Sequence, residues 1–159
     1  MVNIVTDLFL STAGRITRST WWIGIGALVV LNLVLFFVLW TILGPSLITN
    51  FFGRLIWLCV TAFNIYAVYC LSAKRFQDRD RSELNAKVVA GLWAVKAVLD
   101  LFRITGNLGD PGTLDQLFVL AGTGIGLWYF IELGWLEGTP GPNRYGETAV
   151  DLLARLRAE

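Results

Sequence analysis

The chain of 159 residues contains no histidine. This absence removes the commonest general base, the commonest proton switch and the commonest transition-metal ligand from the protein. A Ser/His/Asp set cannot exist without histidine, and the sequence shows neither a cluster of metal ligands nor two carboxylates closely spaced on one helix face. We therefore expect a protein that is not an enzyme and that holds neither a metal nor a cofactor.

Cysteine and charged residues are also scarce. The two cysteines, Cys59 and Cys70, stand eleven residues apart, which is about 16 Å along a helix and too far for a disulfide. Charged residues make up 16% of the chain, thirteen basic against twelve acidic. So small and balanced a charge creates no global field that would recruit nucleic acid, and we expect no nucleic-acid partner.

Hydrophobic residues, in contrast, make up 55% of the chain and are gathered in four long runs. The runs occupy residues 21–43, 51–73, 84–104 and 114–136, each bound being approximate. Each run is long enough to cross the roughly 30 Å hydrocarbon core of a bilayer as an α-helix. The sequence therefore predicts an all-α integral membrane protein, a four-transmembrane-helix bundle that forms a single membrane domain over residues 1–159.

Local signals set the expected ends of these helices. Pro45 lacks the amide that a continuing first helix would need, and Asn50 is a predicted N-cap for the second. Residues 113–116 have the spacing of a capping box ahead of the fourth run. The third run has the weakest hydropathy signal, because it carries Lys96 and Asp100.

The flanking charges predict the orientation. With both ends in the cytoplasm, the segment 1–20, the loop 74–83 and the tail 137–159 lie on the inner side. Ten basic residues then face the cytoplasm, namely Arg15, Arg18, Lys74, Arg75, Arg79, Arg81, Lys87, Arg144, Arg155 and Arg157. Only Arg54 and Arg103 fall outside, which is a strong positive-inside bias.

Two terminal segments are expected to form short interfacial helices. Residues 6–10 form one before Gly14. In the tail, Thr148 with Asp151 is expected to cap another helix. Its apolar face consists of Ala149, Leu152, Leu153 and Leu156, flanked by Arg155 and Arg157. The alternative for this tail is a frayed end in solvent.

Three short strings lie on the predicted cytoplasmic side. They are Gly14-Arg15-Ile16-Thr17-Arg18 followed by Trp21-Trp22, then Lys74-Arg75-Phe76-Gln77-Asp78 running to Arg81-Ser82, and GTPGPNRYG over residues 138–146. With four spans at these intervals, the chain resembles the bacterial inner-membrane family called domain of unknown function 805, over nearly its whole length. It departs from the family pattern at Gln77, where histidine is usual, and at Glu147, where proline is usual.

The resemblance implies a fold and a compartment, the bacterial cytoplasmic membrane with several spans. The family carries no established biochemical activity, so the resemblance implies no reaction. Candidate sites therefore have to come from the residues themselves, and the sequence offers two groups of polar side chains and one pair of glycines.

The first group is a polar layer near the predicted bilayer midplane. Counted from the inner ends of their helices, Asn32, Asn64 and Lys96 lie at nearly the same depth, about 14 to 16 Å. Asp100 follows Lys96 by one turn, so that the two can pair. Such a layer can bind an ion, pass a proton or seat a small ligand. The alternative is interhelical hydrogen-bond glue, at about 1 kcal/mol per bond.

The pair of glycines lies on the fourth run. Gly122 and Gly126 have the spacing that allows close helix approach, either within the bundle or in a homodimer.

The second group is a cytoplasmic cap that we expect to converge in a compact bundle. Its members are Arg15, Arg18, Arg75, Asp78, Arg81, Asn143, Arg144 and Tyr145. Arginines at this level can grip the phosphates of anionic lipids or acidic groups of a partner. The alternative is an internal network in which Asp78 and Asp80 pair with the arginines.

These features favour a non-catalytic membrane protein that acts by binding. The expected role is an accessory or assembly subunit, or a lipid-contacting scaffold, with anionic lipids and a membrane-protein partner or a homo-oligomer as its contacts. The alternative is a small oligomeric transporter or channel that is centred on the midplane layer.

Overall fold

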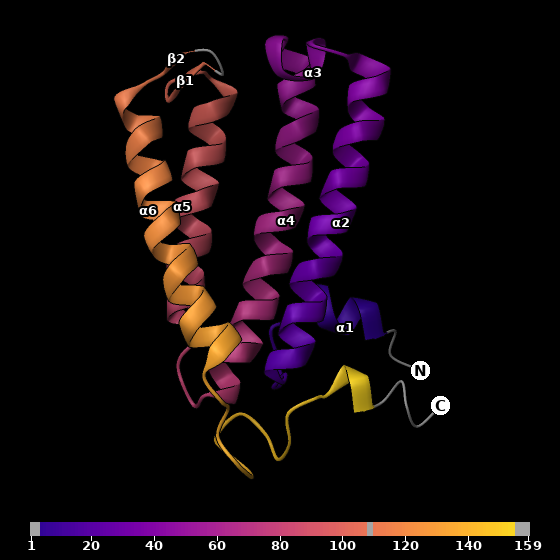
Figure 1. Ribbon diagram of the computed structural model, residues 1–159, viewed down its shortest axis with the longest axis vertical. Coiled ribbons are helices and arrows are strands. Elements are labelled where there is room, and N and C mark those ends of the chain that lie inside the picture. Colours follow the sequence, from indigo (N-terminus) through magenta and orange to yellow (C-terminus); the bar gives the residue numbers. More distant parts are fainter. Residues whose placement is uncertain (1–3, 108–109, 155–159) are drawn as a thin grey trace.

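The computed structural model describes residues 4–107 and 110–154, and these form a bundle of helices (Figure 1). In chain order the elements are α1 Ile4–Leu10, α2 Arg18–Leu43, α3 Ser46–Thr49, α4 Phe51–Asp78, α5 Leu84–Leu101, β1 Gly106–Asn107, β2 Asp110–Pro111, α6 Thr113–Tyr129 and the π-helix η1 Phe130–Trp135. The two short strands pair antiparallel, with Gly106 opposite Pro111. Apart from this pair, the regular elements of the described residues are helical.

Three helices are long and apolar enough to cross a membrane. They are α2, α4 and the continuous helix formed by α6 and η1, Thr113–Trp135. Large apolar side chains on their surfaces are exposed, for example Phe37 at 62% and Leu120 at 71%. Contiguous apolar surface of this kind is unfavourable in water and favourable in lipid. The chain is therefore a multi-pass membrane protein, with three of the four predicted spans supported.

The remaining long helix, α5, is shorter and more charged. It has 18 residues and carries Lys87, Lys96 and Asp100. It ends three residues earlier than the sequence predicts because Arg103 adopts a left-handed conformation, with φ 58°. The amides of Arg103 and Ile104 then bond back to the carbonyls of Asp100 and Leu99, which closes the helix.

Helix α4 corrects the predicted loop 74–83. Residues 74–78 continue the helix and are buried, so the loop begins only after Asp78. The basic residues tolerate this burial because they have partners. Lys74 Nζ, for instance, bonds to the backbone carbonyls of Asp7 and Leu8 in α1. Charge near the end of an apolar run was a misleading sign of exposure here.

The helix starts agree only in part with the predicted caps. Asn50 is the N-cap of α4, as predicted, although its side chain makes no capping bond. The capping box predicted at residues 113–116 is wrong, because α6 begins at Thr113 itself and its N-cap is Gly112. Helix α2 begins three residues before the predicted start, at Arg18, since the side chain of Thr17 accepts from the Thr20 amide at 3.3 Å.

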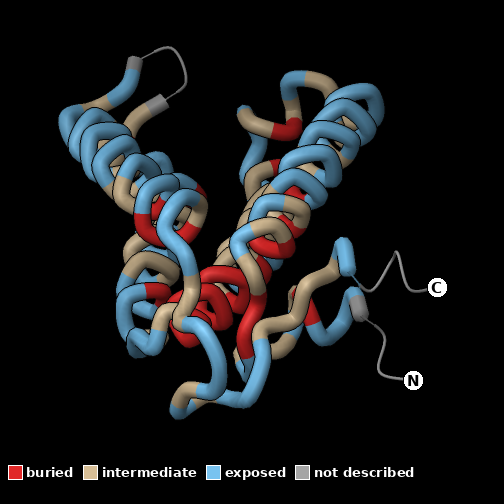
Figure 2. Tube along the Cα trace, turned by 60° about the horizontal axis from the view of Figure 1, so that its bottom comes forward, coloured by how far each residue is buried: buried red, intermediate tan, exposed pale blue. Residues whose placement is uncertain are grey.

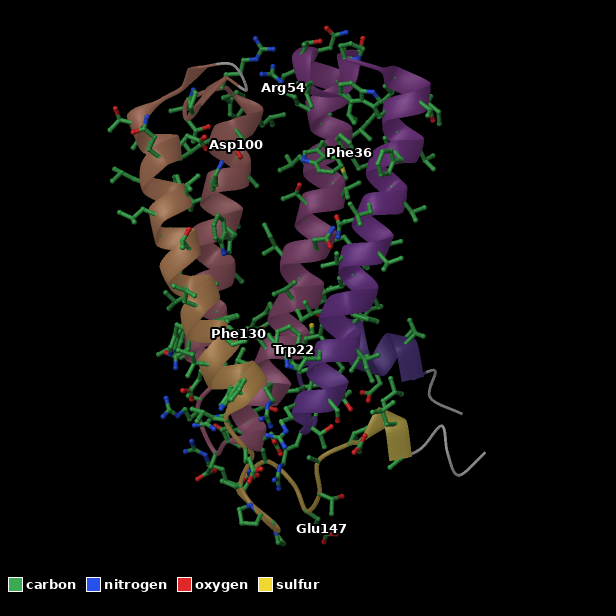
Figure 3. The ribbon with its side chains drawn as sticks, viewed as in Figure 1. Trp22, Phe36, Arg54, Asp100, Phe130 and Glu147 are labelled. Atoms are coloured by element: carbon green, nitrogen blue, oxygen red, sulfur yellow. The ribbon has the colours of Figure 1, made fainter. Side chains whose placement is uncertain are left out.

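The helices form two antiparallel pairs, α2 with α4 and α5 with α6 (Figure 1). Helix α5 contacts α4 near the loop that joins them and diverges from it towards the other end, and η1 reaches α2 (Figure 1). At that meeting point the indole of Trp22 donates to the Gly134 carbonyl at 3.1 Å and contacts the ring of Phe130 (Figure 3). Both chain ends lie at one end of the bundle, the terminal end, whereas α3 and the β1–β2 pair lie at the other, the distal end.

Burial is concentrated at the terminal end (Figure 2). Residues 71–78 of α4 are all buried, and their apolar members Leu71 and Phe76 pack with Trp21 and Leu133 in one hydrophobic cluster. Towards the distal end most helix residues are intermediate or exposed. The protein is thus tightly packed at one end and open at the other.

The predicted terminal helices agree with the described residues in part. Helix α1 covers the predicted segment 6–10. Residues 152–154 are helical, and Asp151 Oδ1 accepts from the amide of Leu153 at 3.0 Å, so Asp151 forms the cap. The predicted cap Thr148 and the predicted face residue Ala149 lie before this helix, because Val150 pairs as a β-bridge with Ile16 and the helix begins only after Asp151. The predicted face residue Leu156 and the flanking Arg155 and Arg157 lie outside the described residues.

Candidate functional site

The centre of the terminal end is the carboxylate of Asp78, the last residue of α4. Arg15 Nη2 lies 3.1 Å from Asp78 Oδ1, and Arg75 Nη1 bonds to Asp78 Oδ2. All three side chains are at most 4% exposed. Two guanidinium groups therefore share one carboxylate in a buried place, where each charge depends on its partners.

Arg15 also ties the beginning of the chain to its tail. Nη1 donates to the carbonyls of Gly141 and Gly146, at 2.8 and 3.0 Å, and Nη2 donates to the Thr139 carbonyl at 2.8 Å. The backbone continues this link, since the Val150 amide donates to the Arg15 carbonyl at 2.8 Å. These bonds account for the burial of an arginine outside the helices.

Arg75 holds the end of the last long helix. Its Nε donates to the Leu133 carbonyl at 2.9 Å, and its Nη2 donates to the Leu136 carbonyl at 2.5 Å. The carbonyls at a helix end have no partner within the helix, and the wide turn of the π-helix η1 brings these two to α4. Arg75 thus acts as the capping group for η1.

Asn143 fixes the tail loop through three bonds. Its Nδ2 donates to the Gln77 carbonyl and to Thr139 Oγ1, both at 2.9 Å. Its Oδ1 accepts from the Tyr145 amide at 2.9 Å, which is the local turn that asparagine favours. Gly146, with φ 148°, closes the turn by two backbone bonds to Asn143.

A glycine permits the tail to pass over the central carboxylate. A methyl group added at Gly138 would overlap Asp78 Oδ2 and would lie 2.6 Å from its Cγ. The following residue, Thr139, donates its amide and its hydroxyl to the Asp78 carbonyl, at 2.9 and 2.7 Å. Any side chain at Gly138 would push the tail off α4.

The outer part of this end consists of more exposed ion pairs. They are Arg18 with Glu137 at 3.5 Å, Arg79 and Arg81 with Glu132 at 2.9 and 3.1 Å, and Arg144 with Asp80 at 3.0 Å. The Arg144 guanidinium also lies 4.8 Å from the centre of the Tyr145 ring. The predicted cap residues are therefore together in one region, which we call the terminal cap: Arg15, Arg18, Arg75, Asp78, Arg81, Asn143, Arg144 and Tyr145.

The terminal cap is more nearly neutral than the sequence suggested. The sequence sets Asp78 and Asp80 against five arginines, whereas the structure adds the carboxylates of Glu132 and Glu137 and a sixth arginine, Arg79. Glu132 is buried, at 6% exposed, and receives both Arg79 and Arg81. In the sequence, the only indication of this role is that Glu132 is a single carboxylate inside an apolar run. This geometry is that of an internal network.

The predicted midplane layer is divided into two groups. Asn32 and Asn64 bond reciprocally, at 2.5 and 2.9 Å, across α2 and α4. Lys96 lies instead near the distal ends of α5 and α6, 2.8 Å from Asp100 and 3.0 Å from Asp115. No hydrogen bond joins the two groups among the described residues, and the predicted pairing of Lys96 with Asp100 is present.

The two glycines of the fourth run differ in their surroundings. A methyl group added at Gly122 would lie 2.7 Å from the Trp93 ring on α5, so this glycine allows close helix contact. A methyl group at Gly126 would meet nothing within 4 Å. The packing role predicted for both residues therefore fits Gly122 and does not fit Gly126 within this chain.

A large cavity, which we call the interhelical cleft, separates α4 from α5 and the start of α6. Its volume is about 1030 Å³. The walls are mostly apolar and aromatic, with Trp57, Val68 and Trp93 among the lining residues. Asn64 and the Lys96 group border it as well. The cleft brings polar groups of the α2–α4 pair and of the α5–α6 pair to one apolar space.

Sequence reasoning missed the two arginines of this cleft, Arg54 and Arg103. Both line it at the distal end. Figure 3 places Arg54 between the α2–α4 side and the α5–α6 side. Nε and Nη1 of Arg54 are buried and have no hydrogen-bond partner among the described residues. The sequence feature that could have identified them is that they are the only two basic residues predicted on the outer side.

Fold and site together define an all-helical, multi-pass membrane protein with an ion-paired cap at one end and an apolar cleft that opens towards the other. A family model described as "Protein of unknown function (DUF805)" matches residues 9–147, so the chain belongs to this family. The resemblance seen in the three short strings is confirmed. No curated protein and no solved structure matches the chain.

Proposed function

We propose that this chain is a non-catalytic protein of the bacterial inner membrane, a lipid-contacting scaffold that holds a lipid in the interhelical cleft. The observation that carries the proposal is the cleft itself, about 1030 Å³ in volume with mostly apolar walls between membrane-length helices. Small-molecule sites in proteins usually measure roughly 300 to 1,000 Å³. A cavity at the upper end of that range, within the lipid phase, suits an acyl chain.

The proposal includes four membrane spans, with α5 as the third. Its 18 residues extend about 27 Å, close to the roughly 30 Å of a hydrocarbon core. Helix α5 follows α4 directly and contacts it, so a spanning α4 carries the start of α5 to the same membrane surface. Its interior charge is compensated, since Lys96 pairs with Asp100 and Asp115. A paired charge near a helix end is tolerated in a spanning helix.

We place the terminal end in the cytoplasm. The arginines of the terminal cap, with Lys74 and Lys87, lie at this end, whereas the distal end has Arg54, Arg103 and the paired Lys96. Such an excess of basic residues is typical of the cytoplasmic side. Reporter fusions after residue 154 are expected to be active only with cytoplasmic reporters, and a periplasmic signal from this fusion would refute the orientation.

The alternative role, a transporter or channel centred on Lys96 and Asn64, has less support. The polar groups of Asn64 are taken by Asn32 and the Val60 carbonyl, and Lys96 already contacts two carboxylates. A conduction site needs groups that exchange partners with the permeating species. Ion flux in reconstituted vesicles that is abolished by Lys96→Ala would restore this alternative.

An accessory role in a larger membrane complex is compatible with lipid binding. The apolar outer faces of α2 and α6 offer exposed surface for another membrane protein or a second copy. We propose such a partner without identifying it. The terminal cap would then hold the two helix pairs together while the spans contact the partner.

Native mass spectrometry of the full chain, purified in mild detergent, tests the proposal. We expect the chain to carry one or more lipid molecules that survive gentle activation. A chain that runs alone, and that also fails to bind added phospholipid, contradicts the proposed function. Ala97→Phe, which places a bulky ring on the cleft wall, is expected to reduce lipid retention. Ala62→Phe on the exposed part of α4 is the matched control.

A further inference from the structure

The distal end of the interhelical cleft is marked by two arginines at helix ends. Arg54 is the fourth residue of α4, and Arg103 follows the last residues of α5. Arg103 Nη2 donates to the Thr49 carbonyl at 2.5 Å, which holds it beside α3. Because both arginines stand at the ends of bilayer-length helices, they lie at the level of the phospholipid headgroups.

The charges around the cleft mouth do not cancel. Lys96 takes both neighbouring carboxylates, Asp100 at 2.8 Å and Asp115 at 3.0 Å. Among the lining side chains that the structure describes, three cations therefore stand beside two anions, and the two arginines have no ion pair there. Nε and Nη1 of Arg54 are the unpaired donors. A buried N–H without an acceptor is costly, so this place favours an anionic oxygen ligand.

The walls below these arginines have the length and the character of an acyl-chain site. From Arg54 to Tyr69 the cleft follows α4 over fifteen residues, about 22 Å. One leaflet contributes about half of the roughly 30 Å core, so an acyl chain fits within this length. Trp57, Val68 and Trp93 supply apolar wall on both sides.

We propose that the cleft binds an anionic phospholipid from the leaflet at the distal end. Its phosphate oxygens accept hydrogen bonds from Arg54, Arg103 adds positive charge, and an acyl chain lies along α4 towards Tyr69. This assignment rests on the proposed lipid-binding function and adds the group that is recognised and the residue that recognises it. Guanidinium groups suit phosphate because each bond is charge-assisted.

The test compares three probes on the full chain in mild detergent by titration and native mass spectrometry. The probes are phosphatidylglycerol, a diacylglycerol with the same acyl chains, and inorganic phosphate. We expect phosphatidylglycerol to bind best and Arg54→Gln to weaken its binding by at least about tenfold, the loss of one charge-assisted hydrogen bond. Lys87→Gln, which removes an exposed cation at the terminal end, is the matched control and should bind as the parent chain does.

A second variant keeps the test valid if Arg54→Gln does not fold, as checked by thermal melting. Arg54→Lys retains the charge but not the guanidinium, and we expect its binding to fall between those of the parent and of Arg54→Gln. Equal phosphatidylglycerol binding by the parent and either Arg54 variant overturns the assignment. Phosphate binding as tight as that of phosphatidylglycerol also overturns it, in favour of a free anion.

The outcomes separate this inference from the proposed function. If diacylglycerol and phosphatidylglycerol bind equally and Arg54→Gln changes the binding of neither, the cleft binds lipid without recognising the phosphate. Only the inference then fails. If neither lipid binds the parent chain, the proposed function fails and the inference fails with it.

Discussion

The two ends of this protein use arginine in opposite ways. At the terminal end, Arg15 and Arg75 are buried, share the Asp78 carboxylate, and donate their other N–H groups to backbone carbonyls. At the distal end, Arg54 borders the interhelical cleft with two buried nitrogens that have no partner among the described residues. The same side chain is thus a structural connector in one place and an available donor in the other.

The difference indicates where binding is to be expected. A charge whose partners are all supplied by the chain contributes to holding the fold, and removing any one partner leaves the others uncompensated. A charge without such partners contributes little to the fold and can be used for a ligand. Stability measurements can therefore distinguish the two ends, and the following variants are ordered from the largest expected effect to the smallest.

Asp78→Asn is expected to have the largest effect. It leaves Arg15 and Arg75 buried without a counter-charge, and breaking a buried pair in this way costs roughly 3 to 5 kcal/mol. We expect a large fall in the thermal midpoint in detergent. Asp80→Asn, which touches only the exposed pair with Arg144, should cost no more than about 1 kcal/mol. Similar losses in the two variants would refute the connector role of Asp78.

Gly138→Ala is expected to follow, with a cost of about 1 to 3 kcal/mol. The added methyl group overlaps the Asp78 carboxylate and displaces the tail from α4. The measurement is the thermal midpoint, together with protease sensitivity of the tail. Gly26→Ala, where a methyl group meets nothing within 4 Å, is the control and should not destabilise the chain. A Gly138→Ala protein as stable as the parent would show that the tail does not need its close approach.

Asn64→Leu tests the contribution of the Asn32–Asn64 pair, which lies between the two ends of the bundle. It removes the reciprocal bonds with Asn32, and hydrogen bonds between membrane helices are worth about 1 kcal/mol. The double variant Asn32→Leu/Asn64→Leu leaves no unpaired amide, so we expect it to be more stable than the sum of the two single losses predicts. Unfolding titrations in detergent measure this coupling, and simple additivity would mean that the two amides act independently.

Arg54→Gln is expected to have the smallest effect on stability, within about 0.5 kcal/mol of the parent. The reason is that the Arg54 Nε and Nη1 groups contribute no hydrogen bond to the described fold. The measurement is the thermal midpoint of delipidated protein, so that a lost ligand does not enter the comparison. A loss as large as that of Asp78→Asn would remove the distinction between the two ends.

Much of the terminal cap was predictable because its residues occur in short strings beside the ends of apolar runs. Arg15, Arg75, Asp78 and Asn143 were all named from such strings, and the structure brings them together. Which arginines pair with Glu132 was not predictable, because the position of a carboxylate near a helix end depends on the path of the π-helix η1. Its burial is compensated only by Arg79 and Arg81, more than fifty residues earlier.

The cleft was not predictable from the runs that border it. Helix α5 closes at Leu101 rather than near residue 104, through a left-handed turn at Arg103. This turn leaves Lys96 and Asp100 in the last two turns of α5, where Lys96 also meets Asp115 at the start of α6. The spacing of Gly122 and Gly126 likewise did not reveal which of the two would meet the Trp93 ring.

The sequence by itself determined that this is a multi-pass helical membrane protein and which short strings flank its spans. Those properties depend on local hydropathy and on the fixed rise of a helix, which neighbouring residues along the chain are sufficient to define. Only the tertiary structure decided which charges are neutralised and where an apolar cleft remains. The physical reason is that Arg15 finds Asp78 across 63 residues, whereas Arg54 finds no acceptor in the described chain, and such pairing depends on how helices pack.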